Sequence, residues 1–519
     1  MKKFLLITVM FSEILICTAQ NNIFQKQIKS GNGYGYASGI ETNGGGFAFV
    51  GAQIPTSGAD VSCILTATNN LGTPLWTRAY GYAGTQIFSS IQQTSDGGFV
   101  LGGTSDHASG VSGSKGIIVK TNSSGDTTWC RAYGGEDGEE FTKVRQTEDG
   151  GYIAIGKTST SAGASDDIYV VKVNTTGAIQ WTRTFGVSVD NDWGSSVEQT
   201  SDQGYIIAGA VFDGVTHNAC MIRLNSSGDT LWTCHYNGAS YDYGYNAIQT
   251  QDGGFILVGS TYSTGSGNGD ILVVKTDPNG NTQWSKVYGT SETETGLSIL
   301  QLGSGDYLIG ANQDANLINY VLLKITSTGS MSWSKQYGTN DLTFQDMNIT
   351  QNDGALMSGV RHTASGFSAF VVKADGAGNA AGCNTTDASL IEGNGDFTIK
   401  KQVVVGTSGN AYSFKIVATT ITTTDSTLCS GLDINENTEK FGMTVFPNPT
   451  SGHITLDLGD AQNFSEIKIY NSIGGLVGSE NVKSVSGKVN IDLSQYGKGL
   501  FLLTSSNTEN TFSVKVLVE

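Results

Sequence analysis

A tryptophan recurs at nearly constant spacing through most of this 519-residue chain. Six tryptophans share the register: Trp76, Trp129, Trp181, Trp232, Trp284 and Trp333. Their successive spacings are 53, 52, 51, 52 and 49 residues. A basic residue lies nine positions before each of the last five, and a glycine follows each basic residue five positions later. A fixed period of this length indicates a repeat architecture, in which each repeat is one supersecondary unit that packs on its neighbours.

Each repeat contains four short segments with the character of β-strands. In the second repeat these are residues 89–94, 99–104, 116–121 and 128–133. Turns that contain glycine, at 95–98 and 122–125, join them in pairs, and glycine supplies the positive φ that a tight hairpin needs. The third segment is apolar on both faces, which is typical of a strand covered on both sides. Four-stranded units repeated radially predict a β-propeller.

The two ends of the repeat array predict how many blades there are. Six repeats are complete, beginning with residues 34–42. The seventh has its first three segments, but Gly382 stands where its tryptophan is expected. A spare fourth segment precedes the first repeat at residues 23–30, with Phe24 in the tryptophan position. We therefore expect an all-β, seven-bladed β-propeller of four-stranded blades, whose last blade is closed by the N-terminal strand so that no open sheet edge is left.

The sequence divides into four parts. Residues 1–19 have the charged start, apolar run and small final residues of a secretory signal peptide. We expect residues 20–382 to form the propeller, 383–440 a β-rich cap or linker, and 441–519 a small separate domain. No other segment approaches the ~20 apolar residues that cross a bilayer, so no transmembrane segment is expected.

The C-terminal part carries several motifs in order. Pro447, Asn448, Pro449 and Gly452 come first, apolar strand-like runs follow, and Lys515 lies near the end. In this order the motifs resemble the type A C-terminal sorting domain of the type IX secretion (Por) system of Bacteroidota. The resemblance implies a small β-sandwich that the outer-membrane translocon recognises and that is then removed. It also implies a protein that is secreted or attached to the cell surface. The propeller repeats are similar, more loosely, to delta-60 and quinoprotein-type repeats, which implies no activity.

Charge and cysteine content narrow the classes of partner and cofactor. The formal net charge is −17 at pH 7, and an acidic surface repels nucleic acid. Cys383 and Cys429 bracket the cap or linker, and we expect them to form a disulfide, which export permits. Cys220 and Cys234 lie on one predicted hairpin, so a second disulfide is left open. No Cys/His cluster indicates zinc. No cofactor is expected, and calcium is left open as a ligand.

Cys63 and Cys130 are expected to be small core residues rather than partners in a disulfide.

Loop residues supply the candidate ligand site. Alternation places the loops that follow the second and fourth strands on one face of the ring, where ligands usually bind on rigid scaffolds. Two successive loops there combine aromatic and acidic residues: Asp190, Asp192, Trp193, Tyr241, Asp242 and Tyr243. Aromatic rings beside carboxylates suit a sugar ring or a cation. The alternative is that the carboxylates, together with Glu136 and Glu294 at matching positions, only brace these loops.

The repeated side chains are expected to be structural. The six tryptophans dock between blades, and the basic residue two positions after most of them makes a cation–π contact. A second set of repeated polar residues is expected to line the axial channel: Gln93, Gln146, Gln199 and Gln249.

The hypothesis drawn from the sequence is a binding or adhesion protein that acts outside the cell on a glycan or a protein. The chain has no HExxH or GxSxG motif. Two alternatives stay open. One is a polysaccharide hydrolase or lyase that uses loop carboxylates such as Asp192 and Asp242. The other is a structural component of a surface layer.

Overall fold

The computed structural model of the chain is all-β, as predicted, and its strands fall into two compact units that divide between Gly431 and Leu432. In the described residues the one helical element is the 3-10 helix η2 (Ser494–Tyr496). The residues described are 23–29, 33–54, 61–81, 84–106, 113–135, 138–159, 165–186, 191–314, 318–337, 342–350, 353–363, 366–380, 385–395, 397–400, 410–413, 417–421, 424–430, 444–446, 450–457, 466–471, 476–481, 488–506 and 511–518. The predicted signal peptide lies outside them.

Seven antiparallel sheets make up the first unit, and we number them by the chain order of their first strands. Sheet 1 contains β2 (Gly33–Glu41), β3 (Phe47–Ile54), β4 (Ser62–Thr68) and β5 (Pro74–Gly81). Sheet 2 contains β6 (Gln86–Gln93), β7 (Phe99–Ser105), β8 (Lys115–Thr121) and β9 (Thr127–Gly134). Sheet 3 contains β10 (Glu139–Gln146), β11 (Tyr152–Ser159), β12 (Asp166–Val173) and β13 (Ile179–Phe185). Sheet 4 contains β14 (Trp193–Gln199), β15 (Tyr205–Phe212), β16 (His217–Leu224) and β17 (Thr230–Asn237).

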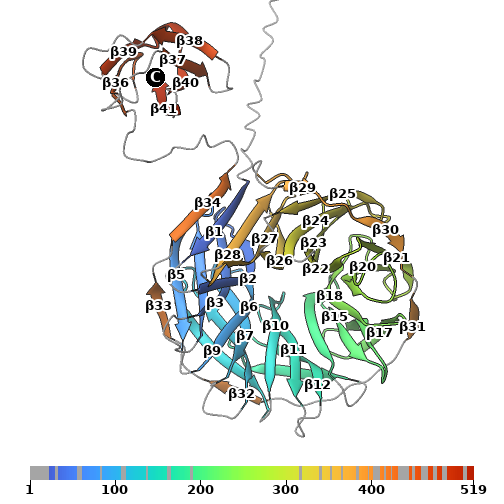
Figure 1. Cartoon of the computed structure of the whole chain (residues 1–519). Helices are drawn as coiled ribbons and strands as arrows, with labels where there is room; N and C mark the ends of the chain where they lie inside the picture. Colours follow the sequence, from blue (N-terminus) through green and yellow to red (C-terminus); the bar gives the residue numbers. More distant parts are fainter. Residues whose placement is uncertain are drawn as a thin grey trace, which may run out of the picture. The chain divides into compact units, whose positions relative to one another are not determined.

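The remaining three sheets repeat this order. Sheet 5 contains β18 (Asp242–Gln249), β19 (Phe255–Thr261), β20 (Asp270–Thr276) and β21 (Thr282–Gly289). Sheet 6 contains β22 (Thr293–Gln301), β23 (Tyr307–Asp314), β24 (Ile318–Ile325) and β25 (Met331–Tyr337). Sheet 7 contains β26 (Leu342–Ile349), β27 (Ala355–Thr363), β28 (Gly366–Ala374) and, as its fourth strand, β1 (Phe24–Lys29). Figure 1 shows the sheets following one another around a ring in chain order, and β2 of sheet 1 contacts β26 and β27 of sheet 7.

The repeat tryptophans pack between neighbouring sheets, as predicted. Each indole lies against a glycine in the turn that follows the third strand of the next sheet. The six glycines have φ between +76° and +85°, and an added Cβ would lie 2.6–3.0 Å from the indole. These glycines are Gly125, Gly177, Gly228, Gly280, Gly329 and Gly378. Only glycine combines this backbone conformation with so close a contact. The predicted cation–π contacts are present at Trp76, Trp181 and Trp333.

The basic residue of each repeat anchors the first turn of its own sheet. The ammonium of Lys120 lies 2.9 Å from a carboxylate oxygen of Asp96, and Lys172 and Asp149 are 2.8 Å apart. Arg223–Asp202, Lys275–Asp252 and Lys324–Asp306 are equivalent pairs, at 2.6, 2.9 and 3.2 Å. Each pair ties the turn after the first strand to the third strand. The periodic basic residue and the periodic acidic turn residue of the sequence therefore form one ion pair in each of these sheets.

Residues 385–430, expected to form a β-rich cap or linker, add a fifth strand to six of the sheets. We call them the rim segment. Its strands join sheets 6, 5, 4, 2, 1 and 7 in turn, against the chain order of the sheets (Figure 1). They are β29 (Thr385–Asp387), β30 (Ile391–Asn394), β31 (Thr398–Lys400), β32 (Asn410–Ser413), β33 (Val417–Ile421) and β34 (Thr424–Ser430). Each pairs with the fourth strand of its sheet, so the rim segment covers edges that would otherwise be unpaired.

Side-chain contacts fix the rim segment as well as backbone pairing. Glu392 forms an ion pair with Lys286 of sheet 5, at 2.8 Å. Its other oxygen accepts the N–H of Met331 of sheet 6 at 3.0 Å. Glu392 thus links two neighbouring sheets at their outer edge.

Four of the described cysteines form no disulfide. They are Cys63, Cys130, Cys220 and Cys234, and all four are buried. Cys220 lies opposite His235, and Cys234 lies opposite Met221. Because the two cysteines are one register position apart, they point to opposite faces of sheet 4 and join different core clusters. The disulfide left open for this hairpin is therefore absent, while Cys63 and Cys130 are core residues as predicted. Cys383 lies outside the described residues, so its pairing with Cys429 stays a prediction.

The second unit contains two sheets. One is β35 (Thr444–Phe446), β36 (His453–Asp457) and β39 (Lys488–Asp492). The other is β38 (Leu476–Asn481), β37 (Glu466–Asn471), β40 (Gly499–Ser506) and β41 (Thr511–Val518). Buried residues from both sheets, such as Ile454, Ile469 and Leu503, share one core. This is the sandwich arrangement that the C-terminal motifs implied.

Candidate ligand-binding site

A buried carboxylate lies at or next to the first residue of the first strand in sheets 3 to 6. Glu139, Asp242 and Glu294 each accept the backbone N–H of the residue four positions earlier, at 2.9–3.0 Å. Asp192, at the same position of sheet 4, accepts the N–H of Phe212 at 2.6 Å. These side chains are at most 1% exposed. The carboxylates brace the loops, as the alternative interpretation expected, although Glu139 takes the place expected for Glu136, which lies outside the described residues.

The two carboxylates considered for hydrolysis, Asp192 and Asp242, both belong to this set of bracing residues. Asp192 and Asp242 are both 0% exposed, so neither reaches a polysaccharide on the loop surface. Burial raises the pKa of the Asp242 carboxyl, although the side chains of Thr261 and Ser263 and the N–H of Gly238 act to lower it. Asp190, the third acidic residue of the predicted site, lies outside the described residues.

The aromatic residues of the predicted site lie together at the surface. We define the aromatic patch as Trp193, His217, Tyr241, Tyr243 and Tyr262. The rings of Trp193 and Tyr243 are stacked with centroids 5.6 Å apart, and those of Tyr241 and Tyr243 are parallel within 2° at 6.4 Å. Tyr241 is 46% exposed and Tyr262 is 43% exposed. The starts of β14 and β18, which are distant in sequence, therefore contribute to one continuous aromatic surface.

His217 lies at the middle of the patch, and the sequence reasoning did not include it. Its ring is 4.9 Å from that of Trp193 and 5.9 Å from those of Tyr241 and Tyr243. Its Nε2 lies 2.9 Å from the carbonyl oxygen of Asn191, which fixes the ring orientation. Tyr262 meets Tyr243 edge-on at 6.3 Å. His217 is the first residue of β16, and Tyr262 lies in the loop after β19. Aromatic residues carry no periodic signal in this part of the repeat.

The patch belongs to sheets 4 and 5 rather than to the repeat. Trp193 and Tyr243 occupy the same repeat position, directly after the bracing carboxylate. Sheets 2, 3 and 6 carry Ile87, Glu140 and Thr295 there. A structural requirement of the repeat would apply to every sheet. This local departure is instead what a binding surface on a regular scaffold would produce.

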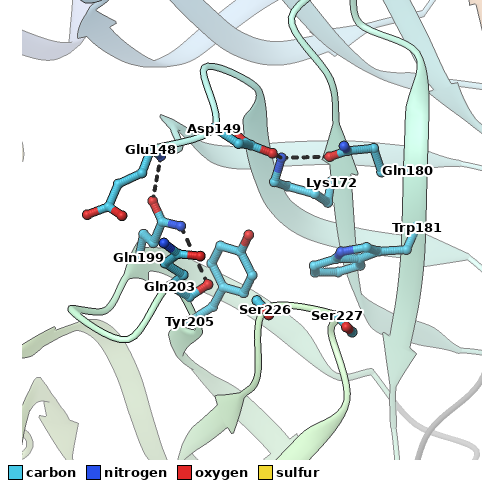
Figure 2. Close-up of a pocket in the computed structure, with 10 residues that line it drawn as sticks. All are labelled: Glu148, Asp149, Lys172, Gln180, Trp181, Gln199, Gln203, Tyr205, Ser226 and Ser227. Atoms are coloured by element: carbon cyan, nitrogen blue, oxygen red, sulfur yellow. Dashed lines mark hydrogen bonds and ion pairs between the residues drawn. The ribbon is translucent and has the colours of Figure 1, made fainter.

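A polar pocket on the opposite face, where the tight turns lie, is formed by residues that recur in the repeat. It lies between sheets 3 and 4 and has a volume of about 640 Å³ (Figure 2). Trp181 and Tyr205 meet edge-on across it at 5.7 Å, and Lys172 binds Asp149 and Gln180. A pocket between sheets 1 and 2 is lined by the matching residues, including Trp76, Gln93 and Phe99. We therefore assign both pockets to the packing of neighbouring sheets.

The glutamines predicted to line the channel link turns of neighbouring sheets. The side-chain oxygens of Gln93, Gln146, Gln199 and Gln249 each accept a 2.8 Å hydrogen bond from a turn N–H of the preceding sheet. One of these bonds, from Glu148 to Gln199, is drawn in Figure 2.

The residues immediately before these glutamines line a central cavity of about 250 Å³: Gln92, Arg145, Glu198 and Ile248. Arg145 and Glu198 form an ion pair there at 2.7 Å, and Lys143 and Asp346 form another at 3.2 Å.

The comparison with known families gives a match in the second unit. Residues 444–519 match the secretion system C-terminal sorting domain. The second unit is a type IX secretion sorting domain. The protein is therefore exported to the cell surface or the extracellular space, and the sorting domain engages the type IX secretion machinery. No helix in the described parts of the chain is long and apolar enough to cross a membrane.

Only part of the sorting-domain motif lies within the described residues. Pro447, Asn448 and Pro449 lie outside the described residues, as does the side chain of Lys515. Gly452 has φ +128°, and its carbonyl accepts the N–H of Leu493 at 2.7 Å, which joins the start of the domain to the end of β39.

Comparisons of the whole chain add little to this. No curated protein matches it. A solved structure of MPT-4, a mannose phosphorylase from Leishmania mexicana in complex with phosphate ion, is similar with a TM-score of 0.26 and 10% identity, covering 60% of this chain and 87% of that one. A likeness this weak supports no inference about fold or function. Within the described residues, no cluster of three or more His, Cys, Asp or Glu side chains is placed to hold a metal ion.

Proposed function

We propose that the first unit is a closed, seven-bladed β-propeller. The support is that its inter-sheet contacts recur seven times. Six are the tryptophan–glycine contacts, and in the seventh Phe24 of β1 lies against Gly72, whose φ is +72°. Sheet 7 thereby meets sheet 1 through the same kind of contact that joins the other sheets. In a closed ring every sheet packs between two neighbouring sheets, so none is left at an open end.

We further propose that export releases or anchors this propeller as the working part of the protein. The domain limits are those expected from the sequence: residues 20–382 for the propeller, 383–440 for the following segment and 441–519 for the removable sorting domain. A bond between Cys383 and Cys429 would fasten the rim segment, whose last strand carries Cys429 beside β1.

The function we propose is binding of an extracellular glycan at the aromatic patch. The observation that carries it is the near-parallel set Trp193, Tyr243 and Tyr241, partly exposed and confined to sheets 4 and 5. Flat, rigid aromatic rings present a large amphipathic contact area that costs little side-chain entropy to order. The apolar C–H face of a sugar ring stacks on such a surface, while the hydroxyl of Tyr241 and the imidazole of His217 offer polar partners at its edge.

Thermal unfolding against a panel of polysaccharides tests this proposal. A ligand present at 100 times its dissociation constant stabilises a protein by about 2.7 kcal/mol, which shifts the unfolding midpoint measurably. We expect at least one neutral polysaccharide to raise the midpoint of the exported protein. Failure of every polysaccharide in the panel would contradict glycan binding and favour a protein partner.

A further inference from the structure

Beneath the aromatic patch, three side-chain oxygens at the boundary of sheets 4 and 5 have no hydrogen-bond donor. They are Oδ1 of Asn218, Asn237 and Asp242, and all three atoms are buried. Asn218 and Asp242 are 0% exposed as whole residues. Buried acceptors without a donor are rare in folded proteins, because the lost hydration is not replaced. Three at one boundary call for a partner that supplies positive charge or protons.

Hydrogen bonds fix which way the two amide groups point. Asn218 donates its Nδ2 to the carbonyl oxygen of Thr216 at 3.0 Å. Asn237 donates its Nδ2 to Asp213 at 2.9 Å. Rotating either amide by half a turn would place an oxygen against an acceptor. The oxygens, rather than the nitrogens, are therefore the atoms left without partners.

The repeat shows that these three positions converge. Asn218 and Asn237 directly flank the paired residues Ala219 and Tyr236 on β16 and β17. At the boundary of sheets 5 and 6 the matching residues are Asp270, Gly289 and Glu294. An added Cβ on Gly289 would lie 1.7 Å from an oxygen of Asp270 and 2.9 Å from one of Glu294. Third-strand, fourth-strand and next-sheet residues therefore meet at one point.

At the boundary of sheets 2 and 3 this point holds a cation from the protein itself. Lys115 occupies the position of Asn218, and Glu139 occupies that of Asp242. The Lys115 ammonium lies 3.1 Å from the Glu139 carboxylate, and both side chains are buried. At sheets 4 and 5 the carboxylate is kept, but the ammonium is replaced by the oxygen of an amide.

We propose that a Ca²⁺ ion binds here, held by Asn218, Asn237 and Asp242. Carboxylate and amide oxygens are the ligands that this hard cation prefers, and water completes its coordination. The ion takes the electrostatic place of the Lys115 ammonium. It joins β16 and β17 of sheet 4 to β18 of sheet 5, directly under Tyr241 and Tyr243. This inference goes beyond glycan binding, because the site stands whether or not the patch binds a sugar.

Terbium luminescence and calcium titration of the full chain, stripped with a chelator, test the site. Tb³⁺ takes the same ligands, and the neighbouring Trp193 and Tyr243 rings sensitise its emission. We expect emission that Ca²⁺ displaces, and a calcium-dependent rise in the unfolding midpoint. Asp242→Asn should abolish both. Asp126→Asn removes an exposed carboxylate on a distant turn and should change neither.

Asn218→Lys provides a second, independent variant. It rebuilds the Lys115–Glu139 pair at sheets 4 and 5, so it should lose metal binding while its chelated form unfolds near the midpoint of the calcium-loaded wild type. Absence of Tb³⁺ and Ca²⁺ binding by the wild type would assign the three oxygens to ordered water and overturn the proposal. Unchanged binding by Asp242→Asn would also overturn it.

Discussion

The ring of Phe24 lies against Gly72 in the turn between β4 and β5, where an added Cβ would be 2.8 Å from the ring. Trp333 makes the matching contact with Gly378 one sheet earlier. Phe24 comes from the start of the chain, and its strand β1 pairs with β28 from the end of the repeat array. One phenylalanine thus joins the two ends of the array to sheet 1.

Replacing Phe24 should destabilise the whole first unit. Phe24 is 3% exposed and also meets Phe47 edge-on at 5.4 Å. We expect Phe24→Ala to lower the free energy of unfolding by about 3–5 kcal/mol, as for other buried aromatic truncations. Urea unfolding followed by tryptophan fluorescence measures this. Phe24→Trp restores the residue of the other six contacts and should stay within about 1.5 kcal/mol of the wild type. Equal loss in both variants would mean that the contact is not equivalent to the others.

Two glycines with the same backbone conformation separate strain from packing. Gly228 and Gly97 both have φ +80°. An added Cβ on Gly228 would lie 2.9 Å from Trp181, whereas nothing lies within 4 Å of one on Gly97. Gly97→Ala should cost about 1–2 kcal/mol for the left-handed conformation alone. Gly228→Ala should cost more, because Trp181 must move. Equal costs in urea unfolding would show that the tryptophan contact contributes nothing.

The turn anchors make stability depend on acid pH. A hydrogen bond from Lys120 lowers the pKa of Asp96 to about 2, and a hydrogen bond from Thr200, together with Arg223, lowers that of Asp202. Because the folded pKa lies below the unfolded value of about 3.9, the stabilisation is complete above that value and is lost as the pH falls towards 2. Urea midpoints measured from about pH 5 to pH 2 should therefore decrease, and Asp96→Asn should flatten the decrease. An Asp96→Asn protein with an unchanged pH profile would contradict this.

The rim segment should protect the sheet edges from association. Deleting residues 385–430 exposes the outer strands of six sheets, and unpaired edges promote intermolecular pairing. We expect this deletion to produce oligomers or aggregates in size-exclusion chromatography. Deleting the sorting domain, residues 444–519, removes none of the strands that pair with these edges and should leave the monomer fraction unchanged. A monomeric rim deletion with an unchanged unfolding midpoint would show that the edges need no cover.

The sequence predicted the features that repeat and missed those that do not. Trp181 and Gly228 were both visible because each recurs at a fixed spacing, and Phe24 was found by its place in that spacing. The rim segment has no period. Its strands pair through backbone groups that almost any residue supplies, so a run such as Val417–Ile421 did not indicate a sheet partner.

The candidate site was predictable in part for a related reason. Trp193 and Tyr243 departed from the repeat at one position and could be recognised by that departure. His217 begins β16 and Tyr262 follows β19, at positions that carry no repeated motif, and only the folded chain brings them within ring contact of Tyr243. Asp192 and Asp242 were ambiguous because a carboxylate beside an aromatic residue suits both a ligand and a loop brace. Because both carboxylates are buried, the structure favours the loop-bracing role.

Calorimetric titration of the best-stabilising polysaccharide into matched variants tests the central claim most directly. Trp193→Ala removes one stacked ring of the patch, and Leu231→Ala removes a 56% exposed apolar side chain of the same sheet outside it. We predict that Trp193→Ala weakens binding by about tenfold or more, which corresponds to about 1.4 kcal/mol, and that Leu231→Ala binds as the wild type does. Equal affinity of the Trp193→Ala and wild-type proteins would contradict a glycan site at the aromatic patch.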